Sequence, residues 1–379
     1  MSDKIKILHC SDLHLCAELS FLKSKAKNRK LEVLNTLQRI VNLCSTNMTD
    51  LLIIAGDLFD SNHADINIVS AVKKMFAAVP ALTVAIVAGN HDYYAVDSPY
   101  SDEDWSRNVI IFFSSYSMIE IPEKNLRLYG SSFISSYQNK NNNSFSVPDD
   151  DMINILIYHG DIVTDNQTSM YNPITVKQLS SSGFDYVALG HIHKASEIQK
   201  AGNTYYAYSG TPDGNGFDET GKKGVYIGEV SKGNVKLNFI NTSSRIFADV
   251  SFDITSLTSN NQIKNAIIKK LEHLYPENFA ENLYKITLTG KYPEGFLPDS
   301  KSIALDLSDS LYYVTVENNS RPDINISALA SDFSLKGIFV QKMLKKMQLC
   351  TNESDKATYE NALYLGLKAF DGEVGFNED

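Results

Sequence analysis

Five short polar clusters, each placed after an apolar run, constrain this chain more than any other feature. They are rich in Asp, His, Asn and Gly, and six of the eight histidines lie in or beside them. The clusters are Ser11-Asp12-Leu13-His14, Gly56-Asp57-Leu58-Phe59-Asp60, Gly89-Asn90-His91-Asp92, Tyr158-His159-Gly160-Asp161 and Gly190-His191-Ile192-His193. Because ligand sites in α/β folds form at the carboxyl ends of strands, five such strand ends predict one shared site.

The apolar runs alternate with helical patterns over roughly the first 245 residues. The runs at 51–55 and 82–87 are short and apolar, and each is closely followed by Gly, as expected of buried strands. Between them Ile68, Val72 and Phe76 recur at helical spacing. Strands that alternate with helices predict an α/β fold, here a β-sandwich flanked by helices.

The polar clusters stop near residue 245, and the pattern changes. Strand-like runs at 250–254, 283–288 and 312–316, with an amphipathic helical stretch at 263–274, predict a smaller α+β domain. Two apolar stripes near the end predict two helices, which either pack on the chain's own domains or bind a partner. We therefore expect three parts, at residues 1–245, 246–330 and 331–379.

The residue types in the clusters are those of a transition-metal site. Residues two apart in an extended segment point to the same side, so Asp12 and His14 could reach one ion, and so could His191 and His193. Mixed imidazole and carboxylate ligands suit Mn, Fe, Zn or Co better than Ca. A lone Asp-x-His or His-x-His is more often a polar pair than a ligand pair. Five clusters in series favour a metal centre.

The composition limits the cellular compartment and the binding partners that we expect. The four cysteines form no C-x-x-C pair and predict reduced thiols, hence a cytoplasmic protein. The first residues are too charged for a signal peptide, and no apolar run approaches the roughly 18 residues of a membrane span. The net charge of −10 argues against broad nucleic-acid binding. Two bound divalent ions would offset about four of these charges, and basic residues cluster at 23–30.

Together the clusters resemble the calcineurin-like metallophosphoesterase family, whose pattern is D-x-H, G-D, G-N-H-D, H and G-H-x-H. The resemblance implies two divalent metal ions, with Mn favoured and Fe, Zn or Mg as alternatives. It implies that one ion is held by Asp12, His14 and His193 and the other by Asn90, His159 and His191, with Asp57 as the bridge. His91 is then the proton donor or a phosphate contact, with Asp92 orienting its ring, unless His91 is only structural.

Further motifs are similar to the SbcD branch of that family, the nuclease subunits of double-strand-break repair complexes. The stretch at 208–226, with Gly221-Lys222-Lys223-Gly224 inside it, resembles shorter YhaO-type members. It departs from their pattern where Asp213-Gly214-Asn215 replaces Gln-Gly-Arg. The resemblance implies a DNA exonuclease or endonuclease, a DNA-capping second domain, a homodimer, and a tail that binds an SbcC-like SMC-type ATPase.

Three functions remain open at this level. The first is two-metal hydrolysis of DNA ends within an SbcCD-like repair complex. The second is hydrolysis of a small phosphodiester such as a cyclic nucleotide, which the acidic charge favours and the extra domain disfavours. The third is a non-catalytic scaffold that binds DNA ends or a partner, which the complete set of ligands disfavours.

Overall fold

The computed structural model describes residues 4–102, 104–139, 145–165 and 167–370. The chain forms two compact units, Met1–Ala248 and Asp249–Asp379. Residues 140–144 of an Asn- and Ser-rich run that we expect to form a surface loop, and residues 371–379 of the predicted tail, lie outside the described residues. The division into three parts with separate roles stays a prediction.

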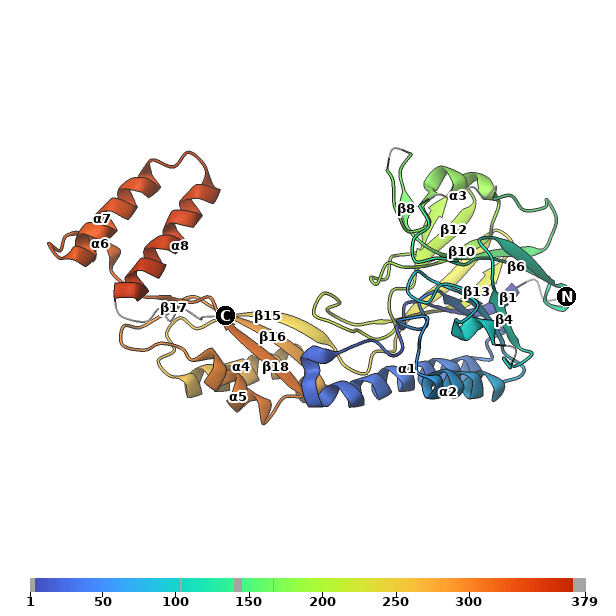
Figure 1. Cartoon of the computed structure of the whole chain (residues 1–379), viewed down its shortest axis with the longest axis horizontal. Helices are drawn as coiled ribbons and strands as arrows, with labels where there is room; N and C mark the ends of the chain where they lie inside the picture. Colours follow the sequence, from blue (N-terminus) through green and yellow to red (C-terminus); the bar gives the residue numbers. More distant parts are fainter. Residues whose placement is uncertain (1–3, 103, 140–144, 166, 371–379) are drawn as a thin grey trace. The chain divides into compact units, whose positions relative to one another are not determined.

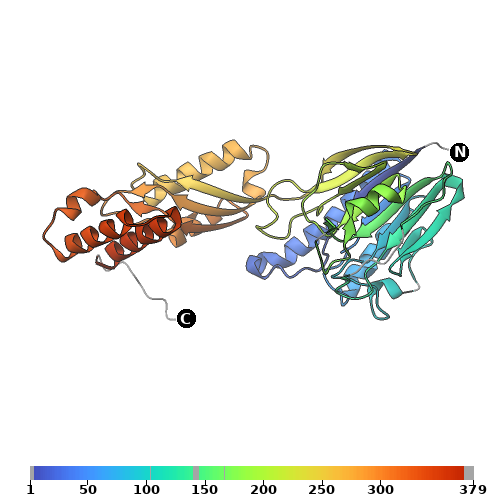
Figure 2. The same cartoon turned by 90° about the horizontal axis from the view of Figure 1, so that it is seen from above.

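The described part of the first unit is built around two six-stranded sheets. The first sheet contains, in order, β14 (Asn234–Asn241), β13 (Gly224–Ser231), β1 (Lys4–Cys10), β2 (Leu51–Ala55), β3 (Thr83–Val87) and β4 (Val109–Phe112). The second contains β11 (Gln199–Ala201), β12 (Thr204–Tyr208), β10 (Tyr186–Gly190), β7 (Ile153–His159), β6 (Leu126–Ser131) and β5 (Ser117–Ile121). Figure 2 shows the yellow β13–β14 hairpin beside the blue β1, with which β13 pairs antiparallel.

Helices cover both outer faces of this sandwich. In Figure 1, α1 (Ala26–Asn47) and α2 (Ile66–Ala77) lie on one side, and α3 (Val176–Ser182) lies on the other. Leu52 and Ile54 of β2 pack with the helices α1 and α2, whereas Ile53 packs between the sheets. Because such strands are buried on both faces, they read as continuous apolar runs. The predicted α/β sandwich flanked by helices is confirmed.

The direction of the strands brings the polar clusters to one edge. Strands β1, β2 and β3 are parallel neighbours, and so are β7 and β10. Their carboxyl ends are linked by the hydrogen bonds from Asp12 N to Gly56 O (3.0 Å) and from Gly160 N to Gly190 O (3.2 Å). The polar residues after these five strands therefore meet at one end of the sandwich.

The second unit contains a three-stranded sheet, which the structure places in the order β15 (Phe247–Asp253), β16 (Leu283–Thr289), β18 (Tyr313–Asn318). Its helices are α4 (Asn260–Leu274), α5 (Ser300–Ser308), α6 (Ile326–Ala330), α7 (Leu335–Gln348) and α8 (Glu353–Phe370). Short elements of the chain are the strands β8 (Ile162–Val163), β9 (Ile174–Thr175), β17 (Lys291–Tyr292) and β19 (Arg321–Pro322), and the 3-10 turns η1 (Ser20–Lys25), η2 (Pro99–Ser101), η3 (Pro122–Lys124) and η4 (Phe279–Glu281).

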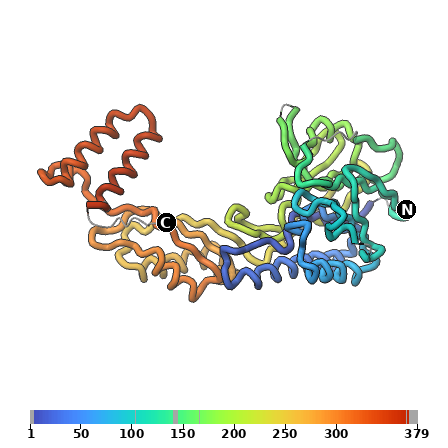
Figure 3. Tube along the Cα trace, viewed as in Figure 1, coloured from blue at the N-terminus to red at the C-terminus, as the bar shows by residue number. Residues whose placement is uncertain are grey.

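The two predicted tail helices are present as α7 and α8, which run side by side in the trace of Figure 3. Val340 and Met343 of α7 pack against Leu363 and Leu367 of α8. The pair therefore buries one stripe within the chain itself. In the part of the chain that the structure describes, no helix is both long and apolar enough to cross a membrane.

Candidate metal centre

All seven predicted metal ligands lie together at the carboxyl edge of the sandwich. Asp12 and His14 follow β1, Asp57 follows β2, and Asn90 follows β3. In the second sheet, His159 ends β7, and His191 and His193 follow β10. Both sheets contribute, so the site spans the top of the sandwich rather than one sheet. The roles of these seven residues as metal ligands stay a prediction.

The backbone reaches this arrangement by turns and not by extended strand ends. The φ angles of Asp12, His14, Asp57 and His191 are 53°, 45°, 50° and 98°, all in the region that non-glycine residues rarely adopt. The prediction that Asp12 and His14 meet through extended geometry is therefore wrong, although they do meet. Residues held in such conformations cluster at functional sites, where the surrounding structure compensates for the strain.

Glycine allows the two sheets to approach closely behind the ligands. A Cβ atom on Gly190 would lie 1.9 Å from the carbonyl oxygen of Ala55, and one on Gly56 would lie 2.2 Å from Nδ1 of His159. Gly56 also has a φ of +91°, which glycine adopts without strain. The glycines of the motifs are thus required where the end of β2 meets β7 and β10 across the sandwich.

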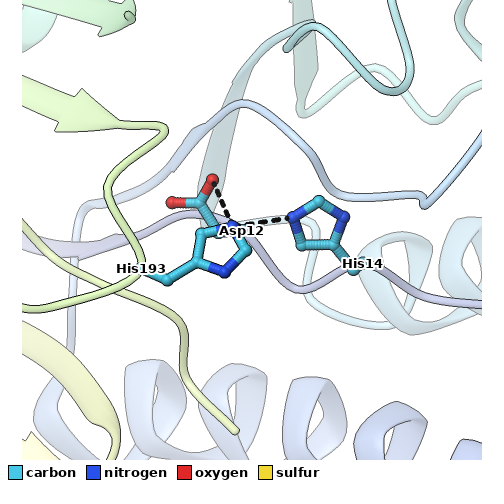
Figure 4. Close-up of side chains that lie close together, drawn as sticks. All are labelled: Asp12, His14 and His193. Carbon is cyan, nitrogen blue, oxygen red and sulfur yellow. Dashed lines mark hydrogen bonds and ion pairs between the residues drawn. The ribbon is translucent and has the colours of Figure 1, made fainter. Parts of the chain in front are cut away.

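The first group of ligand atoms comes from Asp12, His14 and His193, which Figure 4 shows turned toward one another. The Nε2 atoms of His14 and His193 lie 3.1 Å apart, and Nε2 of His193 lies 3.9 Å from Oδ1 of Asp12. Asp12 is fully buried and also accepts hydrogen bonds from the backbone N–H of His191 (3.1 Å). Its carboxylate is therefore held in place from two sides.

Asp57 lies between this group and the second. Its Oδ2 is 3.6 Å from Nε2 of His14 and 3.4 Å from Nε2 of His159. In the second group, Oδ1 of Asn90 is 3.1 Å from both Nε2 of His159 and Nδ1 of His191. One carboxylate thus contacts both groups, which is the arrangement expected of a bridging ligand.

The outward nitrogen of each ligand histidine faces an acceptor. Nδ1 of His14 lies 3.1 Å from Oδ1 of Asp60, and Nδ1 of His159 lies 2.8 Å from the carbonyl oxygen of Ala55. Nδ1 of His193 contacts the carboxylate of Glu219, and Nε2 of His191 lies 3.5 Å from Oδ1 of Asp161. Such partners fix the ring orientation and the position of the proton in metal sites.

The proton positions on His14, His159 and His193 leave the ring nitrogens that face the centre of the site suited to bind a cation. A carbonyl oxygen can only accept, so Nδ1 of His159 donates to Ala55, and its Nε2 presents a lone pair to the oxygens of Asp57 and Asn90. His14 and His193, with protons on Nδ1, likewise present two lone pairs to each other across 3.1 Å. Acceptors facing acceptors are unfavourable unless a positive charge lies between them. The donor set therefore fits divalent metal ions.

The electrostatics of the buried histidines agree with this demand for positive charge. Burial alone would lower the pKa of His14, but its hydrogen bond to Asp60 and the nearby Asp57 and Asp12 carboxylates raise it to about 9. Burial alone would also lower the pKa of His159, but the charge and hydrogen bond of the Asp57 carboxylate raise it to about 9. The cluster attracts a proton wherever it lacks another cation.

His91 and Asp92, the predicted catalytic pair, have different surroundings. The His91 side chain is 47% exposed, and its ring lies 4.6 Å from that of His14 at the open side of the site. Asp92 is fully buried and accepts from Phe59 N (3.0 Å), Gly89 N (2.8 Å) and the Tyr100 hydroxyl. These contacts brace the turn that carries Asn90, and they differ from the predicted one, in which Asp92 orients the His91 ring.

The segment after β12 holds residues that the sequence pattern left without a role. Glu219 lies only in a stretch noted for its resemblance, and nothing near it in sequence indicates a metal site. Asp213, which stands within the departure from the family pattern, binds the fully buried Arg29 and accepts from Thr36 (2.6 Å) and Ser244 (2.8 Å). Arg29 of the basic cluster therefore joins α1 to this loop and is not free to bind DNA.

This chain is similar in sequence to known phosphoesterases. A model of the calcineurin-like phosphoesterase family matches residues 5–195. YhaO of Bacillus subtilis strain 168, an uncharacterized metallophosphoesterase, is 25% identical over 325 residues, which are 82% of this chain and 78% of that protein. The DNA double-strand break repair protein Mre11 of Sulfolobus acidocaldarius is 25% identical over 308 residues, 76% of each chain. The SbcD subunit of the nuclease SbcCD from Bacillus subtilis is 24% identical over 272 residues, 60% of this chain and 67% of that one.

Proposed function

Because this chain belongs to the calcineurin-like phosphoesterase family, as its motifs predict, we propose that it hydrolyses phosphodiester bonds of DNA with two divalent metal ions. Asp12, His14 and His193 would hold one ion, Asn90, His159 and His191 would hold the other, and Asp57 would be shared between the two groups. Manganese is the favoured metal by resemblance to the family, and the mixed imidazole, carboxylate and amide donors suit Mn, Fe, Zn or Co better than Ca.

One observation carries this proposal above all others. The Nε2 atoms of His14 and His193 face each other at 3.1 Å, and Nε2 of His159 faces two oxygens. Each arrangement needs a positive charge between the facing atoms, either a proton or a metal ion. A site built only as a structural polar network would pair acceptors with donors, because an unmatched buried polar group costs free energy. Cations between these atoms would match all of them.

The chain's own groups can then be assigned their parts. Bound divalent ions would supply Lewis acidity and a water of lowered pKa. Asn90 contributes a neutral oxygen, which limits the negative charge of the site and so favours an anionic phosphodiester. His91 donates through Nδ1 to the carbonyl oxygen of Asp60 (3.3 Å), so Nε2 is not used in this contact, and the side chain is 47% exposed. We propose that His91 acts as an imidazolium, protonated on both ring nitrogens, and gives the proton of Nε2 to the leaving oxygen while Nδ1 stays bonded to Asp60.

The choice of DNA as substrate is supported by the relatives. Two of them carry names that state roles in DNA double-strand break repair and as a nuclease. Matching extends over 76% of this chain for the Mre11 relative, well beyond the metal centre. A small phosphodiester would have no need of a second unit, although the net charge of −10 favours such a substrate.

We further propose that the tail serves a partner, an SbcC-like SMC-type ATPase, and that the protein acts as a homodimer. The SbcCD relative is by its name one subunit of a larger nuclease. In the tail, Phe333, Leu335 and Leu365 are 100%, 72% and 60% exposed, although α7 and α8 bury their other stripe together. Phe333 precedes α7, Leu335 begins α7 and Leu365 lies on α8, and exposed apolar side chains on and beside one helical pair favour a partner surface.

The decisive test compares wild type with Asp57→Asn on linear duplex DNA, single-stranded DNA, cyclic nucleotides and a generic phosphodiester, each with Mn and with Mg. Asp151→Asn, which changes an exposed carboxylate, is the matched control. We expect DNA cutting that Mn stimulates, that Asp57→Asn abolishes and that the control retains. Intact DNA in the presence of Mn, with rapid hydrolysis of a nucleotide, would overturn the nuclease assignment.

A further inference from the structure

Two tyrosines extend from the metal centre toward solvent. The ring of Tyr171 lies 4.6 Å, centroid to centroid, from the ring of the predicted ligand His191, with 35° between the planes. The ring of Tyr137 lies 6.0 Å from that of Tyr171 with 42° between the planes. Tyr171 is partly buried, whereas Tyr137 is 56% exposed. The aromatic surface therefore begins at a metal ligand and ends in the open.

The backbone around the tyrosines is fastened to the site. Gln138 N donates to the carbonyl oxygen of Met170 (2.8 Å), and Asn172 N donates to that of Gln138 (2.7 Å). The side chain of Gln138 also donates to that of Asn172 (2.9 Å), and Asn172 Nδ2 donates to the backbone oxygen of His159 (3.1 Å). A hydrogen-bonded path thus runs from both tyrosine segments to a residue of the metal centre. The backbone that carries the two rings is therefore held at a fixed place relative to that residue.

Stability of the fold does not explain this exposure. The neighbouring core contains buried rings such as those of Tyr129, Tyr158 and Phe184, whereas Tyr137 and Met170 (52% exposed) leave large apolar surface in water. An exposed aromatic surface next to a reactive centre is what a substrate with a flat apolar part requires. Within a phosphodiester substrate of DNA, the nucleobase is that part.

We propose that Tyr137 and Tyr171 form a stacking subsite for an unpaired nucleobase adjacent to the phosphodiester at the metal centre. The inference rests on the proposed phosphodiester hydrolysis, and it names the class of substrate, which is single-stranded or frayed DNA. A base within a duplex has both faces covered by its neighbours, whereas an unpaired base can stack on an aromatic side chain. Such stacking tolerates any base, because every base has a π face.

Binding is tested first, so that the result does not depend on catalysis. The probe is a single-stranded phosphorothioate oligonucleotide that contains 2-aminopurine, whose fluorescence falls on stacking, titrated with the full chain in Mg²⁺. We expect quenching by wild type and by Tyr137→Phe, which keeps the ring. Tyr137→Ala should bind roughly tenfold more weakly and quench less. Phe239→Ala, which removes a 39% exposed ring on β14, should match wild type. Equal quenching by Tyr137→Ala, or none by wild type, would overturn the subsite.

Cleavage then tests the subsite and the proposed function separately. In Mn²⁺, wild type and Tyr137→Ala are compared on a natural oligonucleotide and on one with abasic positions. We expect Tyr137→Ala to raise KM roughly tenfold on the natural strand and much less on the abasic strand, because the ring then has no base to stack on. Equal effects on both strands would contradict stacking. Stacking without any cleavage by wild type would sink the nuclease proposal and leave the subsite standing.

Discussion

The carboxylate of Glu219 holds the ring of His193. One of its oxygens contacts Nδ1 of the ring, and the other accepts a hydrogen bond from Asn215 N (2.7 Å). Glu219 is only 7% exposed, and Lys223 Nζ donates to the backbone oxygen of His193 (3.3 Å). Side chain and backbone of His193 are thus both fixed by one loop. The contact sets the proton on Nδ1 and leaves Nε2 to face His14.

We therefore expect Glu219→Gln to weaken metal binding at the group formed by Asp12, His14 and His193. An amide can still accept the hydrogen bond, but it lacks the charge that raises the basicity of the imidazole, so affinity should fall about 10–100-fold. Calorimetric titration of the metal-free protein with Mn²⁺ would show one weakened site and one unchanged site. Glu229→Gln changes a surface partner of Lys4 and should retain both sites. Two sites of wild-type affinity in Glu219→Gln would contradict the role of Glu219.

His91→Ala separates catalysis from metal binding. His91 lies at the open side of the site and contacts Asp60, so its loss should leave both groups of ligands intact. We expect an unchanged metal content, measured by elemental analysis, and a kcat lowered by about 10²–10⁴-fold, the range for a general acid. KM should change little. Loss of metal in this variant would instead make His91 a ligand.

The sequence reveals the ligands because the chemistry demands polar residues where buried strands end. Asp57 and Asn90 stand out for that reason, and the order of the clusters leads to the family. The sequence does not reveal how the ligand residues meet. The positive φ angles of Asp12 and His14 depend on contacts with the turn after β2, such as the hydrogen bond from His14 N to Asp57 O (3.0 Å). The role of Glu219 cannot be predicted from the sequence, because its contact with His193 depends on how the loop folds back over that residue.

Alanine substitutions at Gly190 and Gly233 distinguish the effect of steric crowding from the effect of lost backbone freedom. A Cβ on Gly190 would lie 1.9 Å from Ala55 O and 2.9 Å from Nδ1 of His159, so Gly190→Ala must push the two sheets apart at the metal centre. We expect lower thermal stability and loss of metal. Gly233 has a φ of +68°, and a Cβ there would meet no atom within 4 Å, so Gly233→Ala should cost only about 1–2 kcal/mol and keep the metal. Thermal melting and metal content would check both, and a fully loaded Gly190→Ala would refute the crowding.

Low pH should break one ion pair between α1 and the loop after β14. Glu32 on α1 binds Arg245, with Nη2 to Oε1 at 2.7 Å and Nε to Oε2 at 2.9 Å, and also Arg29 at 3.1 Å. Burial alone would raise the pKa of Glu32, but the hydrogen bonds and charges of the two arginines outweigh it and hold the pKa below its usual value of 4.5. A lowered folded pKa means that the stabilisation is fully present above the unfolded pKa and is lost as the pH falls through the folded pKa.

Glu32→Gln should therefore lower the stability of the first unit near neutral pH, and its difference from wild type should shrink as the pH falls below about 4.5. The single tryptophan, Trp105, lies in that unit, so its fluorescence in urea follows this unit alone. Comparing the two chains at each pH, with EDTA present, removes the contribution of the metal ligands, which is common to both. A gap in urea midpoints that stays constant from pH 7 to pH 3 would show that the charge of Glu32 adds nothing.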